Sequence, residues 1–475
     1  RADQIGAIGT DFTSCTVLAV NRAGTPLCQD RRFRKNPHAW VKLWKHHATQ
    51  NEADAINELG ARRGEAFIKA YGGKYSSEWF FSKVLETVRE APEIYQAADF
   101  FIEGCDWIVW QLTGKQTRNV SAAGFKGMRV HRDGADWSYP SPEFFGQLHP
   151  RLRETVTEKL GGPVVHLGSA VGALTAEMAD RLNLPPGIPV AAGNIDAHAA
   201  VPACGVTQPG TLVMIMGTST CHLLIANDGA EVQGVCGVVQ DGVVPGYWGY
   251  EAGQPGVGDL FAWYVEQAAP ASVVDQARQK KLGLHDFLAA QAGRLRPGES
   301  GLLALDWWNG NRSVLADAEL SGVLLGLTIH TRPAEIYRAL IEATAFGTRK
   351  IVDAFTTKGL AINELVASGA LAQKNPVLMQ IYADVLQRPI SVAAHEQSSA
   401  LGSAMWGAVA AGLHPNIHKA AEAMVKPSRK VYSPHRAHKK IYDRLYEEYS
   451  RLHDEFGRKA GILKVLRTLQ REAAQ

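Results

Sequence analysis

The sequence has no long apolar run, no marked excess of charge of either sign and no closely spaced pair of cysteines. A membrane-spanning helix needs about 18–20 consecutive apolar residues, and no stretch approaches this length. The 50 basic and 47 acidic residues leave a charge of +3, which is too small for a protein that binds nucleic acid by bulk charge. The six cysteines form no CxxC motif and no signal peptide opens the sequence, which together predict a reduced, cytoplasmic protein.

Several catalytic and binding motifs are also missing. The P-loop pattern is absent, because Gly72-Gly73-Lys74-Tyr75 lacks both the hydroxyl and the spacing. No G-x-S-x-G motif of a nucleophilic serine is present. His414 and His418 have the i, i+4 spacing of zinc ligands, but Pro415 and a loop-like setting favour a solvated pair, and no third ligand suggests itself. These patterns predict no protein-bound metal.

What remains has the composition of a globular protein, with 46% hydrophobic and 20% charged residues. A chain of 475 residues is too long for one hydrophobic core, so two or three domains are expected. The polar turn Thr-Gln-Pro-Gly at 207–210 is the best boundary. We therefore predict domains at 1–206 and 207–475.

Hydrophobic patterning and turn residues predict the order of the elements. Residues 5–20 have the pattern of a β-hairpin, residues 40–91 are helical with a break at Gly72-Gly73, and residues 129–150 form an exposed loop. After residue 188 strands and helices alternate, which predicts an α/β fold. Strands are expected at 188–193, 211–216, 324–329, 365–368 and 390–392, and helices at 197–204, 333–354, 375–386 and 400–411.

A Gly-Thr-Ser-Thr tip lies between two apolar stretches, 213–216 and 221–224. Such a tip can point successive backbone N–H groups and hydroxyls at a phosphate. A plain hairpin turn has the same pattern, so both interpretations stay open for this segment alone.

The segment Gly-Asn-Ile-Asp-Ala-His at 193–198 runs from a strand end into an apolar helix. A carboxylate at such a junction, here Asp196, can lie at the floor of a cleft and accept a hydroxyl proton. Asp is also a common helix N-cap. The two roles are compatible.

Residues 366–375 have the pattern of a strand, a turn of small residues at Gly369 and Ala370, and the start of a helix. Small residues let the flat face of a nucleotide base lie against the backbone. A tight strand-to-helix connection explains the pattern equally well.

Taken in chain order, the segments at 193–198, 213–224 and 366–375 resemble three motifs of the FGGY carbohydrate kinases: the catalytic aspartate, the second phosphate hairpin and the adenosine turn. That family is part of the actin/hexokinase/Hsp70 superfamily. Residues 322–342 are similar to the C-terminal signature of that family. The resemblance covers essentially all 475 residues. Four longer strings are similar to the members of the family that phosphorylate L-ribulose: residues 11–16, 40–47, 250–254 and 305–312.

The resemblance implies a role for each matched residue. Asp196 would be the general base that takes the proton of the sugar's terminal hydroxyl as its oxygen attacks the γ-phosphorus. The expected contacts are Gly217, Thr218 and Ser219 for the γ-phosphate; Gly369, Ala370 and Asn375 for adenosine; and Ser14, Trp44, Lys126 and Glu251 for the sugar. Three of these have ordinary alternatives: core packing for Trp44, and a solvated surface charge for Lys126 and Glu251.

One part of the family pattern is missing. The family opens with a hairpin bearing D-x-G-T-x-S-x-R, which residues 9–14 imitate only superficially, since the residues that follow match a later, sugar-side strand. We therefore expect the first phosphate hairpin to be absent and the N-terminal domain to be incomplete. On that expectation the chain alone is catalytically deficient and prone to associate through residues 5–12, whereas an N-terminally extended form is active.

The resemblance implies an α/β fold of two ribonuclease H-like domains with the active site in the cleft between them: sugar on 1–206 and nucleotide on 207–475. The cofactors would be ATP and Mg²⁺, with a small sugar as partner, no nucleic acid and no membrane; a homodimer is left open. The expected reaction is phosphorylation of L-ribulose at its 5-hydroxyl. The alternatives are a kinase for another ketopentose or pentitol (xylulose, D-ribulose or ribitol) and a nucleotide-driven binding module without a sugar site.

Overall fold

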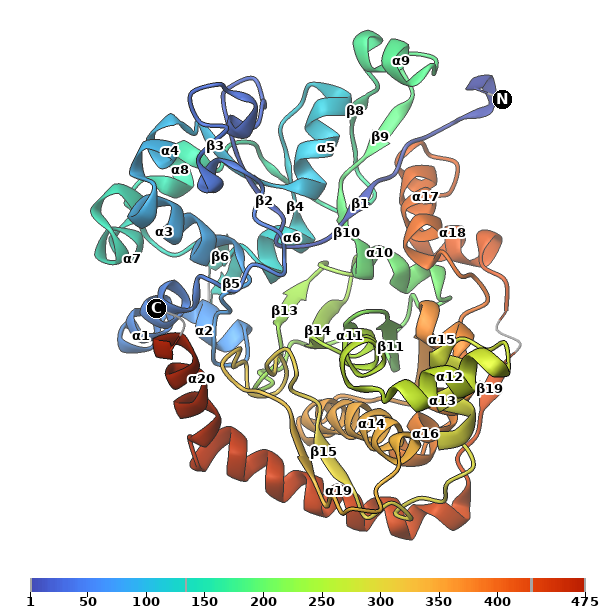
Figure 1. Cartoon of the computed structure of the whole chain (residues 1–475). Helices are drawn as coiled ribbons and strands as arrows, with labels where there is room; N and C mark the ends of the chain where they lie inside the picture. Colours follow the sequence, from blue (N-terminus) through green and yellow to red (C-terminus); the bar gives the residue numbers. More distant parts are fainter. Residues whose placement is uncertain (1, 133–134, 428–429, 474–475) are drawn as a thin grey trace. The chain divides into compact units, whose positions relative to one another are not determined.

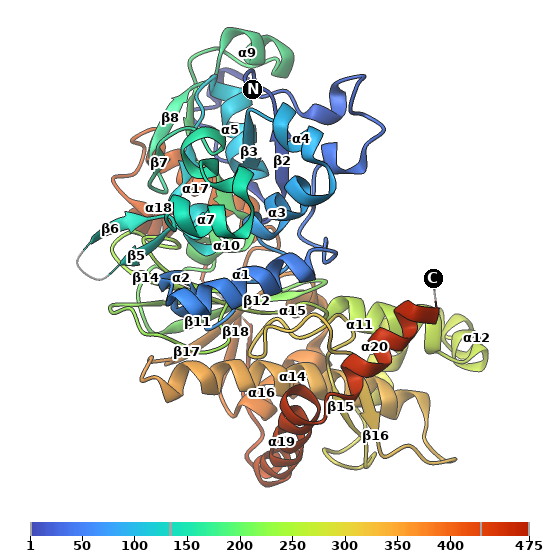
Figure 2. The same cartoon turned by 90° about the vertical axis from the view of Figure 1, so that its left-hand side faces the viewer.

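The computed structural model describes residues 2–132, 135–427 and 430–473 (Figures 1 and 2). Contacts between residues divide the chain into two units, each assembled from three segments of the sequence. The first unit comprises residues 1–209, 223–251 and 397–426, and the second comprises 210–222, 252–396 and 427–475. The predicted division into domains at 206/207 stays a prediction.

In the second unit, the alternating strands and helices after residue 210 produce a mostly parallel sheet. β11 (Thr211–Met216) pairs in parallel with β17 (Glu364–Ser368), and β17 pairs in parallel with β18 (Ile390–Val392). β19 (Lys430–Tyr432) is antiparallel to β18. These strands form one end of a seven-stranded sheet with the order β13-β14-β12-β11-β17-β18-β19. The parallel register brings the carboxyl ends of β11 and β17 to the same edge.

Two helices of the second unit, α14 (Pro333–Thr357) and α16 (Pro376–Leu386), lie beside each other (Figure 2). α14 begins with Pro333, whose missing N–H costs nothing in the first turn, and the backbone N–H of Arg332 donates to Glu335 Oε2 at 2.6 Å. The other elements of this unit are α11 (Gly258–Trp263), η5 (Tyr264–Ala268), α12 (Ala271–Gln279), α13 (Leu284–Ala292), β15 (Leu303–Leu305), β16 (Val323–Leu325), α15 (Ala370–Lys374), η6 (Arg436–His438), α19 (Lys439–Asp454), η7 (Glu455–Lys459) and α20 (Ile462–Ala473). β12 (Thr220–Ala226) and β14 (Trp248–Gln254) contain residues of both units.

In the first unit, short strands and two crossing helices surround residue 196. β1 (Asp11–Phe12) pairs in parallel with β10 (Asn194–Ile195), and β10 leads directly into α10 (Asp196–Ala203). α10 lies beside α17 (Ser398–Ala410; Figure 1). The helices approach closely at a glycine, because a Cβ on Gly402 would lie 1.7 Å from the carbonyl oxygen of Ala199.

An aromatic core in the first unit supports the segment that carries Lys126. The ring of Trp79 lies 4.7 Å from that of Tyr71 and 5.0 Å from that of Tyr75. The Tyr75 hydroxyl, fully enclosed in this core, donates to the carbonyl oxygen of Lys126 at 2.6 Å. Core packing therefore fixes the backbone of Lys126 directly.

The remaining elements of the first unit are short. The strands are β2 (Val17–Val20), β3 (Phe100–Glu103), β4 (Arg118–Asn119), β5 (Val130–Arg132), β6 (Ala135–Ser138), β7 (Val164–Val165), β8 (Ala170–Ala173), β9 (Pro189–Ala191) and β13 (Gly237–Gln240). The α-helices are α1 (Gln50–Arg63), α2 (Ala66–Ala70), α3 (Phe80–Glu90), α4 (Pro92–Ala97), α5 (Gly104–Thr113), α6 (Val120–Phe125), α7 (Pro142–Leu148), α8 (Thr155–Lys159), α9 (Ala176–Leu182) and α18 (Ile417–Met424), and the short 3₁₀ helices are η1 (Ala2–Gln4), η2 (Leu27–Gln29), η3 (Pro37–Ala39) and η4 (Pro150–Leu152).

Most elements predicted after residue 188 are confirmed, with β11 at its predicted bounds and α14, α16 and α17 within three residues at each end. The predicted hairpin over residues 5–20 is wrong: β1 pairs with the distant β10, and β2 pairs antiparallel with β3. The predicted loop at 129–150 is also wrong in part, because it contains β5, β6 and α7, although residues 133–134 lie outside the described residues. Within the described part of the chain, no helix combines the length and the apolar character needed to cross a membrane.

Candidate active site

Asp196 is the first residue of α10, directly after strand β10. Its Oδ1 accepts the backbone N–H of Ala197 at 2.8 Å, which satisfies one of the free N–H groups at the start of the helix. The N-cap position itself is held by Ile195. Burial of the carboxylate raises the pKa of Asp196 to about 6; the bond from Ala197 opposes this shift, and the charge of Asp11 adds to it. The group can therefore exchange a proton near neutral pH.

Several polar groups lie near Asp196 in the first unit. Asp11 lies opposite Asn194 in the β1–β10 pair, and its Oδ2 accepts the Ser403 hydroxyl at 2.5 Å. Two buried atoms beside it, Thr10 Oγ1 and Asn194 Nδ2, have no hydrogen-bond partner among the residues that the structure describes. Buried polar groups are nearly always hydrogen-bonded, so these two atoms could bond to a molecule bound beside Asp196.

Lys126 and Glu251 form a buried ion pair in the first unit. Lys126 Nζ lies 2.6 Å from Glu251 Oε1, and the two side chains are 3% and 7% exposed. Burial alone would raise the pKa of Glu251, but the charge of Lys126 and the hydrogen bond with His198 hold it well below its usual range. Burial would lower the pKa of Lys126, and the charge of Glu251 raises it above its ordinary value instead. Both groups are therefore ionised, and neither is the solvated surface charge that the sequence left open.

Two further residues extend this ion pair into a network. His198 Nε2 lies 2.9 Å from Glu251 Oε2, and His198 Nδ1 lies 2.7 Å from Ser121 Oγ, the hydroxyl of a residue on α6. His198 is fully buried and stands two residues after Asp196. The charges of His198 and Glu251 both act on the pKa of Asp196. The network thus lies within electrostatic reach of the carboxylate.

A buried lysine of α3 joins the backbone segments next to Ser14 and Trp44. Lys83 Nζ donates to the carbonyl oxygen of Cys15 at 2.5 Å and to that of Leu43 at 2.9 Å, so one ammonium group ties the neighbours of both residues. Ser14 is partly buried, and Trp44 packs partly buried against the core of the first unit. Burial raises the pKa of the neighbouring Cys15 thiol, and the charge of Lys126 opposes this shift.

Sequence patterns gave no role to Ser121, His198, Lys83 or Asp11. His198 lies inside the segment 193–198 that pointed to Asp196. Its position two residues after that carboxylate could have indicated a role in the site. The others have partners far along the chain, for example 68 residues between Lys83 and Cys15, so no local pattern could have found them.

The Gly217–Ser219 tip lies in the second unit and is hydrogen-bonded to the start of α11. The Gly217 N–H donates to Ser219 O at 2.8 Å, which closes the tip. Thr218 O accepts the N–H of Val257 at 2.8 Å, and Gly217 O accepts that of Gly258 at 3.1 Å. A Cβ on Gly258 would lie 2.6 Å from Gly217 O. The tip's carbonyl groups are therefore turned toward α11.

The second nucleotide segment lies at the same edge of the sheet. Gly369 follows β17 with φ +97° and ψ 171°, a conformation that is essentially restricted to glycine. A Cβ there would lie 2.4 Å from the carbonyl oxygen of Met216, the last residue of β11. Ala370 begins α15, and Asn375 Oδ1 caps α16 by accepting the Leu378 N–H at 3.0 Å. The parallel β11–β17 pair thus brings the two predicted nucleotide segments together.

We predict that Gly369→Ala lowers the affinity for ATP about tenfold or more, equivalent to at least ~1.4 kcal/mol, because the added Cβ must displace the turn from β11. Gly359→Ala is the matched control: Gly359 also has a positive φ, +79°, but no atom within 4 Å of the added Cβ. That variant has only the backbone cost of about 1–2 kcal/mol in stability. Nucleotide titration and thermal unfolding of both variants measure the difference; equal ATP affinities would contradict the prediction.

Comparison with known proteins places this geometry in a family. The model of the FGGY family of carbohydrate kinases, C-terminal domain, matches residues 212–411. The ribulokinase of Halalkalibacterium halodurans is 54% identical over 474 residues, covering 99% of this chain and 84% of that protein. The ribulokinase of Geobacillus thermodenitrificans is 53% identical over 461 residues, covering 96% and 81%. The solved structure of ligand-bound xylulose kinase from Lactobacillus acidophilus has a TM-score of 0.76 at 16% identity, covering 96% of this chain and 85% of that one.

The chain belongs to the FGGY family of carbohydrate kinases and is an ATP-dependent sugar kinase. Within that family, the two relatives described above are both ribulokinases. The family and the α/β fold expected from the sequence motifs are confirmed. The roles of the individual site residues stay predictions.

Proposed function

We propose that the chain phosphorylates L-ribulose at its 5-hydroxyl, giving L-ribulose 5-phosphate and ADP. The observation that carries the proposal is the carboxylate of Asp196, with its raised pKa, beside the buried Lys126–Glu251–His198 network. A kinase acting on a sugar needs a base for the hydroxyl and fixed polar groups to orient the sugar. The choice of L-ribulose follows the identity of 54% with a ribulokinase.

In the proposed reaction Asp196 accepts the 5-hydroxyl proton while that oxygen attacks the γ-phosphorus. The new O–P bond forms as the bond between the γ-phosphorus and the bridging oxygen breaks, and ADP leaves with that electron pair. Proton acceptance by a positioned base is typically worth about 10²–10⁴-fold in rate. Asp196 suits this task, because a carboxylate with a pKa of about 6 is ionised at neutral pH yet more basic than an ordinary aspartate.

The sugar would be oriented by the ion pair and an aromatic face. Lys126 has three ammonium hydrogens, and Glu251 accepts one of them. Since the ammonium group has no second hydrogen-bond acceptor among the described residues, the other hydrogens would be available to the sugar's carbonyl or hydroxyls. The second oxygen of Glu251 is held by His198, which fixes the direction of the carboxylate. Ser14 and the face of Trp44 would contact the rest of the ketopentose; Lys83 holds the carbonyl groups of their neighbours Cys15 and Leu43.

The nucleotide would bind to the second unit. Gly217, Thr218 and Ser219 form a tight tip in which the Gly217 N–H is used on Ser219 O. The backbone N–H groups and hydroxyls of Thr218 and Ser219 would therefore meet the γ-phosphate. Gly369 and Ala370 present a surface without large side chains, and Asn375 lies at the N-terminus of α16. These features support adenosine binding at the edge where β11 and β17 end.

Magnesium is the cation we expect with ATP, and the residues around Asp196 fit it. Mg²⁺ is usually held by one or two carboxylates plus substrate phosphates. Asp11 lies close enough to raise the pKa of Asp196 through its charge, and the buried hydroxyl of Thr10 beside it lacks a partner among the described residues. Asp11 would hold the ion, directly or through water, and the ion would neutralise charge on the transferred phosphoryl group.

We predict that ATP consumption requires L-ribulose, and we would measure it on the N-terminally extended form, because the chain alone is expected to be catalytically deficient. A coupled ADP-release assay compares L-ribulose with D-ribulose, D- and L-xylulose, ribitol and glycerol, each at the same concentration. A reaction without sugar gives the baseline rate of ATP consumption. The highest kcat/KM is expected for L-ribulose, with phosphate on carbon 5 by NMR. A higher value for xylulose or a pentitol would contradict the substrate, and sugar-independent ATP consumption would favour a nucleotide-driven module.

A further inference from the structure

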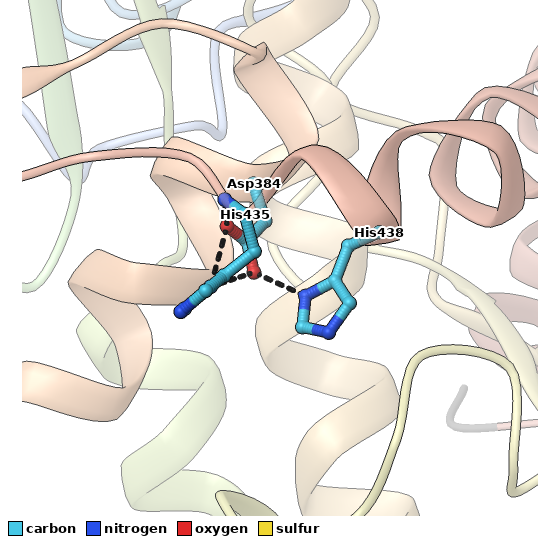
Figure 3. A group of neighbouring side chains, drawn as sticks. All are labelled: Asp384, His435 and His438. Atoms are coloured by element: carbon cyan, nitrogen blue, oxygen red, sulfur yellow. Dashed lines mark hydrogen bonds and ion pairs between the residues drawn. The ribbon is translucent and has the colours of Figure 1, made fainter.

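Asp384, His435 and His438 converge in the second unit, away from every residue given a role above (Figure 3). Asp384 lies on α16, His438 ends η6 and His435 directly precedes η6. Asp384 Oδ2 lies 2.7 Å from His438 Nδ1 and 3.2 Å from His435 Nδ1. Both imidazole rings therefore present the same nitrogen to one carboxylate oxygen.

Among the described residues, Asp384 has no ion-pair partner with a permanent positive charge. Its side chain is 4% exposed, and its ion-pair partners among the described residues are the two histidines alone. A buried charge is normally paired with a fixed opposite charge or bound to a metal. A cation placed between the carboxylate and the two imidazoles would supply the missing positive charge.

The two carboxylate oxygens are differently placed. Oδ1 accepts the backbone N–H of His435 at 2.7 Å and the Gln380 amide at 2.9 Å, and it lies 3.2 Å from His435 Nδ1, as Oδ2 does. The amide nitrogen of Gln380 also lies 2.9 Å from Ser433 O and 3.0 Å from His435 Nδ1, a contact that bound zinc would replace. Hydrogen bonds to the non-coordinating oxygen orient a metal-binding carboxylate. Oδ2 then faces the two Nδ1 atoms.

We propose that Asp384, His435 and His438 form a binding site for Zn²⁺. Zinc takes imidazole nitrogen and carboxylate oxygen at about 2.0–2.2 Å, in tetrahedral geometry, with water completing a three-residue site. Each imidazole binds through Nδ1 when its proton is carried by Nε2. His435 and His438 are 56% and 33% exposed in their side chains, so water reaches the site. Bound zinc would join the start of α19 to α16.

A second group of potential ligands shows why charge balance matters. His38, Glu86 and Glu90 also lie close together, in the first unit. There, however, Lys42 forms a buried ion pair with Glu86 and so already supplies the positive charge. A dication would have to displace or lie beside that ammonium group, so we expect no zinc at this second group.

The test is zinc titration of untagged, chelator-treated protein without ATP. Isothermal titration with ZnCl₂ should give one saturable site per chain, and the Tm should rise with free Zn²⁺. His435→Ala and His438→Ala, both at accessible positions, should each weaken binding by at least tenfold, whereas His38→Ala should leave it unchanged. Binding that survives both of the first two substitutions, or that is lost in His38→Ala, would overturn the proposal.

Cobalt provides a measurement that does not depend on the variants folding. Co²⁺ bound in place of Zn²⁺ should give the visible absorption of a four-coordinate nitrogen and oxygen site, bleached by one equivalent of ZnCl₂. Absence of saturable zinc binding by the wild-type protein, or a purely six-coordinate cobalt spectrum, would show that the histidines only hydrogen-bond to Asp384. Kinase activity enters none of these measurements, so their outcome is independent of the proposed reaction.

Discussion

Asp196→Asn is expected to lower kcat by about 10²–10⁴-fold, the usual contribution of a positioned general base, and to leave sugar affinity nearly unchanged. Asparagine keeps the shape of the side chain and an oxygen that can accept the Ala197 N–H, so α10 should begin as before. The loss would then lie in the chemical step alone, which appears in kcat with little change in KM. Steady-state kinetics with L-ribulose and direct sugar titration measure the two quantities.

The wild-type pH profile provides a second readout of the same residue. With a pKa of about 6, Asp196 is protonated below that pH and cannot accept the hydroxyl proton. Therefore kcat/KM should fall about tenfold per pH unit below 6 and level off above it, and this inflection should vanish in Asp196→Asn. Glu177→Gln, which removes a carboxylate from the first turn of α9, is the control and should keep both rate and profile. Near-normal turnover of Asp196→Asn would contradict the role as general base, and Asp196 would then only stabilise the start of α10.

The second unit could largely be predicted from the sequence, because its strands are buried and its helices are long. β11 is a continuous apolar run, and its neighbour β17 is predicted almost to the residue. Once both strands are known to be parallel, the tip at 217 and the turn at 369 must lie at one edge of the sheet. Local sequence thus placed the expected nucleotide residues together.

The first unit could be predicted less well, because its strands are short and their partners are distant. Residues 5–20 have the alternation of a hairpin, yet Asp11 pairs with Asn194 and Val17 with Glu103. Alternation of apolar and polar residues indicates that one face of a strand is buried. It does not indicate which other strand the segment pairs with. The pairing of β1 with β10 is also what brings Asp11 to Asp196, so the same error concealed a residue of the candidate site.

Lys126→Met is expected to destabilise the protein by about 3–5 kcal/mol, because it leaves Glu251 charged, buried and without its cation. Among the described residues the ammonium group makes no other ion pair, and the Glu251 side chain would keep its hydrogen bond with His198. Lys69→Met is the matched control, since Lys69 and Glu231 form an ion pair 71% and 66% exposed in the same unit. An exposed pair contributes about 0–1 kcal/mol. Urea unfolding followed by tryptophan fluorescence compares the variants.

The double variant Lys126→Met/Glu251→Gln separates stability from binding. It removes both charges, so most of the stability lost in Lys126→Met should return, since a buried ion pair replaced as a unit is often neutral. L-ribulose affinity should not return, because the sugar would lose both its ammonium donors and its carboxylate acceptor. The coupling energy between the two sites, from the double-mutant cycle, would then be large for unfolding and small for sugar binding. If the double variant binds L-ribulose as the wild type does, Lys126 and Glu251 serve the core of the first unit alone.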